Sequence, residues 1–353
     1  MNARSFNRIV IGLVVFLCFI TILAGCGSKS TSVTSGTVTA TLQEGITTDG
    51  TNFYVTDADS NIIRKVVIAT GAVITLAGST GLSGSTDGTG SAARFNAPCD
   101  ITTDGTNLYV ADSDNSTIRK VVIATGAVTT LAGTAGVFGS ADGTGTSAQF
   151  RVPSGITTDG TSLYVADYYN STIRKVVIAT GAVTTLAGSP GVSGSADGTG
   201  SAARFLGLSG ITTDGTNLYV ADTWNRTIRK VVIATGAVTT LAGNAGVSGS
   251  TDETGSTALF NLPFSITNDG ANLYVTDDHR VIRKVVIATG AVTTLADSTF
   301  DASGITTDGI NLYVANRVDE TIWKVVIATG TVTTLASRAG ASSAALLNKA
   351  ASE

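Results

Sequence analysis

The chain has 353 residues, among them 41 glycines, 4 prolines, 3 cysteines and a single histidine, and its formal net charge at pH 7 is −4. One histidine excludes a zinc site built from several histidine ligands. The mild acidity argues against nucleic-acid binding, which needs a basic surface.

The N-terminus has the layout of an export signal. Arg4 and Arg8 are the only charges before Ile9–Leu23, an uncharged apolar run of 15 residues. A positive segment followed by an apolar one is typical of a secretory signal peptide, and a membrane-spanning helix needs about 20 apolar residues. An uncleaved anchor is the alternative.

The letters LAGC, which end at Cys26, follow directly. They resemble the lipobox of bacterial lipoproteins. The resemblance implies cleavage of residues 1–25 and a Cys26 that carries a diacylglyceryl thioether and an N-acyl chain, enough for stable membrane attachment. Gly27, in place of Asp, favours the outer membrane. We therefore expect a lipid-anchored cell-envelope protein with residues 26–36 as its flexible tether.

Cysteine usage adds one expectation. Cys18 lies in the apolar run and Cys26 at the lipid site, so only Cys99 lies in the region expected to fold. We expect no intramolecular disulfide. Cys99 occupies a position that holds Ser154, Ser209 and Phe264 in sister units. We expect it to be a tolerated small side chain and not a reactive thiol.

The remainder is repetitive. "ITTDG" or a close variant begins at isoleucines spaced by 55, 55, 55, 55 and 39 residues, namely Ile46, Ile101, Ile156, Ile211, Ile266 and Ile305. Within a unit, "GITT", "NLYVAD", "TIRKVVIA" and "AVTTLAG" read as strands, and Asp-Gly and Thr-Gly read as tight turns. Four-stranded units repeated at a fixed period are typical of β-propeller blades.

The repeat also resembles a known family, the NHL-repeat proteins. The unit at Phe150–Gly188 has the full pattern, with Pro153, Gly155, Ile156, Asp159, Leu163, Tyr164, Val165, Asp167, Ile173, Arg174, Thr180, Gly181, Leu186 and Gly188. The resemblance covers about 300 residues and implies an all-β, six-bladed β-propeller over residues 37–337, followed by a tail at 338–353. Leu208 and Asn316 depart from the pattern.

The sequence offers one outer strand too many. Residues 36–42, "GTVTATL", look like the fourth strand of a unit, and so do residues 331–335 at the other end. Either the N-terminal strand completes the last blade and displaces 331–335, or it lies as an added edge. Because exposed edges are usually covered, we expect the N-terminal strand on the last blade.

Strand order sorts the loops onto two faces. The loops between second and third strands share one face with the links between units, and they hold nearly all that varies. We call this the variable face. Its candidate ligand-binding residues are Tyr168, Tyr169, Trp224, Asn225, Arg226, His279, Arg280 and Arg317. We expect the three aromatic side chains among them to be exposed. Binding hot spots of protein interfaces are enriched in aromatic and arginine side chains. Three explanations of these residues remain open: they bind a protein partner, they bind a glycan or small molecule, or they reflect simple drift of the loops after duplication.

Signals for chemistry are weak. No nucleophile-elbow motif accompanies His279, and the "DGTG" loops lack the Gly-Lys-Ser/Thr of a phosphate cradle. Asp57–Asn61 and Asp112–Ser116 begin like calcium loops but lack the later glycine and acidic residue. We expect the aspartate of each "YVAD" to accept N–H groups of its own turn. No metal or cofactor is expected.

The sequence therefore predicts a monomeric, non-catalytic binding or scaffold module for an envelope or extracellular protein, or for a glycan. The alternatives are a propeller lyase or hydrolase, and a structural envelope protein without a specific ligand.

Overall fold

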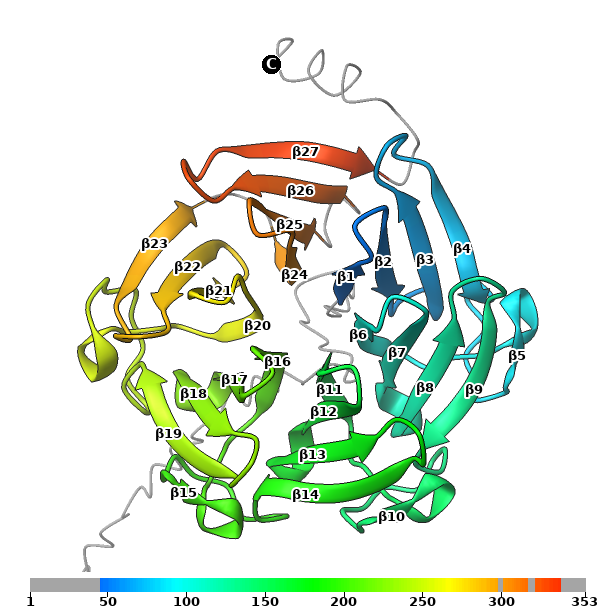
Figure 1. Cartoon of the computed structure of the whole chain (residues 1–353), viewed down its shortest axis with the longest axis horizontal. Coiled ribbons are helices and arrows are strands. Elements are labelled where there is room, and N and C mark those ends of the chain that lie inside the picture. The colour runs from blue at the N-terminus through cyan, green and yellow to red at the C-terminus, as the bar shows by residue number, and fades with distance from the viewer. Residues whose placement is uncertain (1–44, 298–300, 317–320, 338–353) are drawn as a thin grey trace, which may run out of the picture.

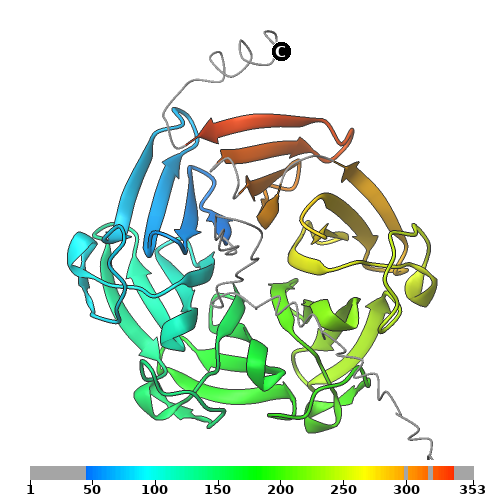
Figure 2. The same ribbon diagram turned by 180° about the vertical axis from the view of Figure 1, so that it is seen from behind.

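The computed structural model describes residues 45–297, 301–316 and 321–337. These residues form six antiparallel sheets around a central axis, so the predicted all-β, six-bladed propeller is confirmed (Figure 1). In each blade the first strand lies nearest the axis, and the second, third and fourth follow in order toward the outside (Figure 1). Figure 2 shows the ring from behind.

The blades follow one another along the chain. Blades 1 to 3 consist of β1 (Ile46–Thr48), β2 (Asn52–Asp57), β3 (Ile62–Val67) and β4 (Val73–Gly78); β6 (Pro98–Thr103), β7 (Asn107–Asp112), β8 (Thr117–Val122) and β9 (Ala127–Ala132); and β11 (Pro153–Thr158), β12 (Ser162–Asp167), β13 (Thr172–Val177) and β14 (Ala182–Gly188). Blades 4 to 6 consist of β16 (Leu208–Thr213), β17 (Asn217–Asp222), β18 (Thr227–Val232) and β19 (Ala237–Ala242); β20 (Pro263–Asn268), β21 (Asn272–Asp277), β22 (Val281–Val286) and β23 (Val292–Asp297); and β24 (Ala302–Thr307), β25 (Asn311–Asn316), β26 (Thr321–Val326) and β27 (Val332–Ser337).

Short elements occupy the links and loops. Blades 2, 3 and 4 each gain a fifth, outermost strand from the preceding link, namely β5 (Gly88–Thr89), β10 (Gly143–Thr144) and β15 (Gly198–Thr199). The helical segments described are 3₁₀ turns of three residues: η1 (Gly90–Ala92), η2 (Ser113–Asn115), η3 (Gly145–Ser147), η4 (Tyr168–Asn170), η5 (Gly200–Ala202), η6 (Thr223–Asn225) and η7 (Gly255–Thr257).

The core lies between blades. One cluster joins Tyr109 and Ile118 of blade 2 to Phe150 of the following link and to Leu163 and Val176 of blade 3, and all five are fully buried. Each such aliphatic side chain contributes about 1.5–3 kcal/mol on burial. Since both faces of a blade pack against a neighbour, the strands are apolar on both sides, as in "NLYV".

The invariant turns have a local explanation. Asp104 Oδ1 accepts the N–H groups of Thr106 and Asn107, and its Oδ2 accepts the Tyr109 hydroxyl at 2.8 Å. Burial and this carboxylate raise the pKa of Tyr109. The same contacts recur in the other blades, so the repeated "TDGTNLY" builds a turn.

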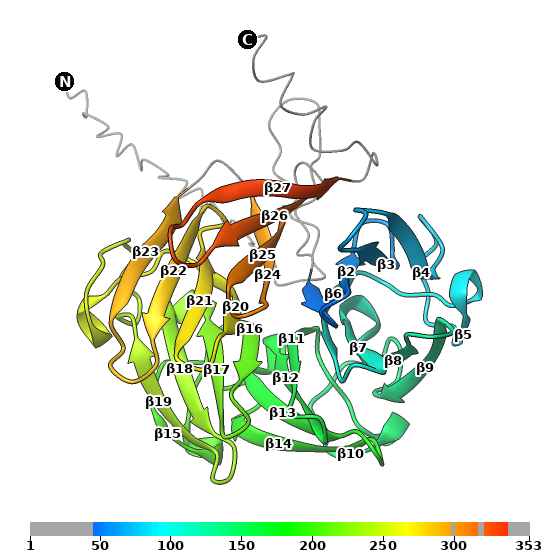
Figure 3. The same cartoon turned by 45° about the horizontal axis from the view of Figure 1, so that its top comes forward.

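Closure of the ring differs from expectation. β27 pairs antiparallel with β26, so residues 332–337 supply the outer strand of blade 6, and the predicted displacement of this segment is wrong. Residues 36–42 lie outside the described residues. Blades 1 and 6 are neighbours in the ring (Figure 3). They meet through side chains, with the ring centroids of Phe53 and Tyr313 4.6 Å apart.

Candidate functional site

A buried carboxylate holds each variable loop in place. In blade 4, Asp222 Oδ1 accepts the Leu206 N–H at 2.8 Å, which fixes the preceding link. Its Oδ2 accepts Asn225 Nδ2 at 2.8 Å and Arg229 Nη1 at 2.7 Å. The loop that contains Trp224 and the link that precedes the blade are therefore both hydrogen-bonded to Asp222, whose side chain is inaccessible to solvent.

Arg229 completes this network. The fully buried guanidinium also donates to Asp197 Oδ1 at 2.7 Å and to two carbonyl oxygens, and it lies 5.2 Å from the Phe205 ring centroid. Burial raises the pKa of Asp222 to about 6, although Arg229 opposes the shift. We call this Asp–Arg–Asp arrangement the blade lock. It recurs as Asp112–Arg119–Asp87, Asp167–Arg174–Asp142 and Asp277–Arg283–Asp252.

The blade lock corrects one expectation. In these four blades the "YVAD" aspartate accepts N–H groups from the link 15 or 16 residues earlier, not from its own turn. Asp57 alone shows the expected pattern among the described residues, because its Oδ1 accepts the Ser60 N–H at 2.9 Å.

Three predicted residues meet at one cavity. Tyr168 and Tyr169 lie on η4 of blade 3, and Trp224 lies on η6 of blade 4. Together with the link between these blades they line a cavity of about 470 Å³, which we call the aromatic pocket. The other lining residues are Ser171, Gly191, Ser193, Leu206 and Gly207.

Contacts between the blades fix the aromatic rings. Trp224 Nε1 donates to the Tyr168 hydroxyl at 2.6 Å, and Tyr168 meets Tyr169 edge-on with centroids 4.9 Å apart. Tyr168 is only 7% exposed, so the expectation that it is exposed is wrong, whereas Tyr169 is 40% exposed. A Cβ on Gly207 would lie 1.8 Å from Trp224 Cδ1, so only glycine admits the indole there.

The other candidates lie apart from these contacts. Asn225 is buried and serves the blade lock, and Arg226 is half-buried with a left-handed backbone (φ 60°). On blade 5, His279 stacks on Phe264 at 4.2 Å and its Nδ1 lies 3.1 Å from the Ala302 oxygen, while Arg280 is exposed. Arg317 lies outside the described residues.

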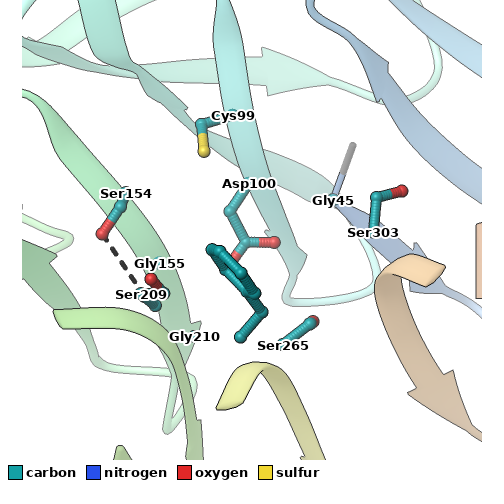
Figure 4. Close-up of a pocket in the computed structure, with 10 residues that line it drawn as sticks. Gly45, Cys99, Asp100, Ser154, Gly155, Ser209, Gly210, Ser265 and Ser303 are labelled. Atoms are coloured by element: carbon teal, nitrogen blue, oxygen red, sulfur yellow. Dashed lines mark hydrogen bonds between the residues drawn. The ribbon is translucent and has the colours of Figure 1, made fainter. Parts of the chain in front are cut away.

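A second, smaller cavity lies among the first strands of the blades, around the central axis (Figure 4). Its volume of about 20 Å³ suits one water molecule. All six blades contribute to its lining: Gly45, Cys99, Asp100, Ser154, Gly155, Ser209, Gly210, Phe264, Ser265 and Ser303. The backbones approach closely, since a Cβ on Gly155 would lie 2.1 Å from the Ser209 oxygen.

Asp100 is the residue that the sequence reasoning missed. Its Oδ2 accepts the Ile156 N–H of blade 3 at 2.8 Å, and its Oδ1 accepts the Ile101 N–H at 2.9 Å. The side chain borders the cavity and is half-buried, and this burial raises its pKa to about 7. The available signal was that Asp100 replaces the glycine found at Gly155 and Gly210 in sister units.

Cys99 differs from expectation as well. It is disulfide-bonded, so the expectation of no disulfide is wrong. The other two cysteines, Cys18 and Cys26, lie outside the described residues.

Two further observations concern only the residues that the structure describes. These contain no group of three or more His, Cys, Asp or Glu side chains arranged to hold a metal ion. They also contain no helix with the length and hydropathy that a membrane crossing requires.

Comparison with known proteins identifies NHL-repeat homologues. The chain is 38% identical over 144 residues to NHL repeat-containing protein 2 of Homo sapiens, which covers 38% of this chain and 20% of that protein. It is 36% identical over 133 residues to Protein SUPPRESSOR OF QUENCHING 1, chloroplastic, of Arabidopsis thaliana (35% and 12%). The chain thus spans at most about a fifth of these relatives. No protein-family model matches.

Solved structures share the fold at low identity. Two auxiliary nutrient binding proteins, from Bacteroides ovatus and Bacteroides thetaiotaomicron, give TM-scores of 0.57 and 0.54 at 16% and 14% identity, with 82% and 79% of this chain and 68% and 65% of theirs covered. Streptogramin B lyase gives 0.54 at 14% identity, with 86% and 84% covered.

Proposed function

We propose that this chain is a non-catalytic binding module of the cell envelope, which holds a protein or glycan partner through its variable face. The observation that carries the proposal is the aromatic pocket, where Tyr168, Tyr169 and Trp224 from neighbouring blades converge on a cavity of about 470 Å³. Small-molecule sites have volumes of about 300–1,000 Å³ with mostly apolar, aromatic walls. Two fold neighbours described as nutrient binding proteins support a binding role.

The anchoring part of the proposal rests on the N-terminal sequence. Residues 1–25 would be removed, Cys26 would be lipidated, and residues 26–36 would tether the propeller of residues 37–337, with 338–353 as a tail. The sulfur of Cys26 cannot carry a lipid thioether and also form a disulfide with Cys99. The acyl mass on Cys26 is therefore the direct test of lipidation. Loss of membrane partitioning in C26A supports the anchor; unchanged partitioning overturns it.

Capture from envelope extract tests the binding role. The bait is the full chain solubilised in detergent, alongside the double variant Tyr169→Ala/Trp224→Ala. The matched control is Phe138→Ala, which removes a 57% exposed aromatic side chain from the link between blades 2 and 3, outside the aromatic pocket. A partner retained by the wild type and the control but lost by the double variant supports the proposal. Equal capture by all three, or by none, contradicts it.

A further inference from the structure

We infer that the aromatic pocket is a subsite for one uncharged sugar ring, stacked on Tyr169 and hydrogen-bonded by Ser171 and Gly207. The inference rests on the proposed binding function and narrows its ligand to a neutral saccharide. Three properties of the pocket lead to it: the charge of its lining, the rigidity of its rings, and two polar groups left unpaired.

The lining carries no charged side chain. It consists of three aromatic residues, two serines, two glycines and a leucine. A carboxylate, phosphate or ammonium group placed there would lose water without gaining an opposite charge from the lining residues, which is costly. The chemistry of the pocket therefore selects an uncharged ligand.

The rings form a preorganised platform. Tyr169 is held by the edge of Tyr168 and by the Arg151 guanidinium, which lies 5.5 Å from its ring centroid. The Trp224 indole is held by its hydrogen bond to Tyr168. Because these side chains are already fixed, a ligand binds with little loss of side-chain entropy. The faces of a pyranose present C–H groups, which pack on an aromatic ring.

Two polar groups distinguish this pocket from the equivalent place between blades 2 and 3. There the Val152 N–H donates to Ser116 Oγ at 3.3 Å. The equivalent pair here is Gly207 N–H and Ser171 Oγ, and within the described residues neither group has a hydrogen bond. Ser171 is 6% exposed and both residues line the cavity.

These groups exclude a purely apolar ligand. Such a ligand would bury the Ser171 hydroxyl and the Gly207 N–H without partners, which destabilises the complex. A sugar hydroxyl accepts from the N–H and exchanges a hydrogen bond with Ser171, while Ser193 offers a further hydroxyl. An uncharged ring with apolar faces and a hydroxylated edge satisfies every part of the lining.

Tryptophan fluorescence offers a direct test, because the chain contains only two tryptophans, Trp224 and Trp323. Trp323→Phe leaves Trp224 as the sole indole in the full chain, held in a polyoxyethylene ether detergent that contains no sugar. The probes are cellotriose, maltotriose and chitotriose, with trigalacturonate as the charged comparison. We expect a saturable change in emission with at least one neutral trisaccharide and much weaker binding of trigalacturonate.

Variants in the same background locate the site. Tyr169→Ala should weaken binding about tenfold or more, as for an aromatic hot spot, whereas Tyr169→Phe keeps the ring and the affinity. Ser171→Ala should weaken binding several-fold, and Phe138→Ala should have no effect. Unchanged circular dichroism confirms that each variant is folded.

Two results would overturn the inference. One is no emission change with any neutral trisaccharide up to about 10 mM; the other is trigalacturonate binding as tightly as the neutral sugars. If the sugars fail but a protein is captured in a way that needs Tyr169 and Trp224, the proposed function stands and the saccharide inference falls.

Discussion

Replacing Arg229 by methionine should strongly destabilise the propeller. The change retains much of the side-chain length but removes the donors to Asp222, Asp197 and two carbonyl oxygens. Asp222 is then a fully buried carboxylate without a cation. Removing one partner of a buried ion pair costs about 3–5 kcal/mol, a large part of the about 5–15 kcal/mol that stabilises a typical domain.

Blade 1 provides the matched control. Arg64 pairs with Asp57, but these side chains are 19% and 10% exposed, and the described residues show no second carboxylate on this arginine. Arg64→Met should therefore cost only about 1–2 kcal/mol. A third variant, Arg229→Met/Asp222→Asn, removes the uncompensated charge and should recover part of the loss.

Urea unfolding followed by circular dichroism measures these differences. The R229M deficit should also shrink between pH 7 and pH 5. Without the guanidinium the folded-state pKa of Asp222 rises further above 3.8, so the cost of the buried charge is present above that pKa and disappears as the carboxylate is protonated. A loss below about 1 kcal/mol, or equal losses in R229M and R64M, would refute the reasoning about the buried ion pair.

Three further predictions concern other parts of the molecule. Burial raises the pKa of Asp100 from its ordinary value of 3.8 to about 7 in the folded state, so the wild type should lose stability as pH rises from about 4 to 7. D100G, which restores the glycine of sister units, should flatten this slope in calorimetry, and identical slopes would contradict the assignment. Gly207→Ala should displace Trp224 and cost at least about 1 kcal/mol, because φ is +65° and the Cβ would lie 1.8 Å from the indole; unaltered Trp224 emission would count against this. Tyr168→Phe removes the acceptor of Trp224 Nε1 and should cost about 1 kcal/mol, with unchanged urea stability as the contrary result.

The sequence predicted what is local to a unit. The period located six blades, and alternation and turn residues located strands such as Ser162–Asp167. The sequence could not decide whether residues 36–42 or residues 331–335 form the outer strand of the last blade. Both segments have the composition of an outer strand, and the choice depends on their partners elsewhere in the chain.

Contacts between units were harder to infer. Arg174 reads as one residue of a β-branched strand, yet it pairs with Asp142, 32 residues earlier, in the link that precedes the blade. Tyr168 reads as an exposed loop residue, but its hydroxyl accepts a hydrogen bond from Trp224, 56 residues later. Strand periodicity reports which face of its own sheet a residue occupies, and says nothing about what a neighbouring unit places against it.

The short strands from the links also indicate which segment of the chain must be duplicated to add a complete blade. Gly88–Thr89 pairs with Ala127 and Val128 on the outer strand of blade 2, and Asp87 bonds to Arg119 and Thr130 of the same blade. The unit that carries its own edge strand and its own link carboxylate therefore starts at Asp87 and not at the first strand. A duplication that copies the chain from Asp87 to the next equivalent aspartate, Asp142, delivers a blade with its own edge strand and carboxylate, so copy number can evolve by recombination in the links without leaving either product incomplete.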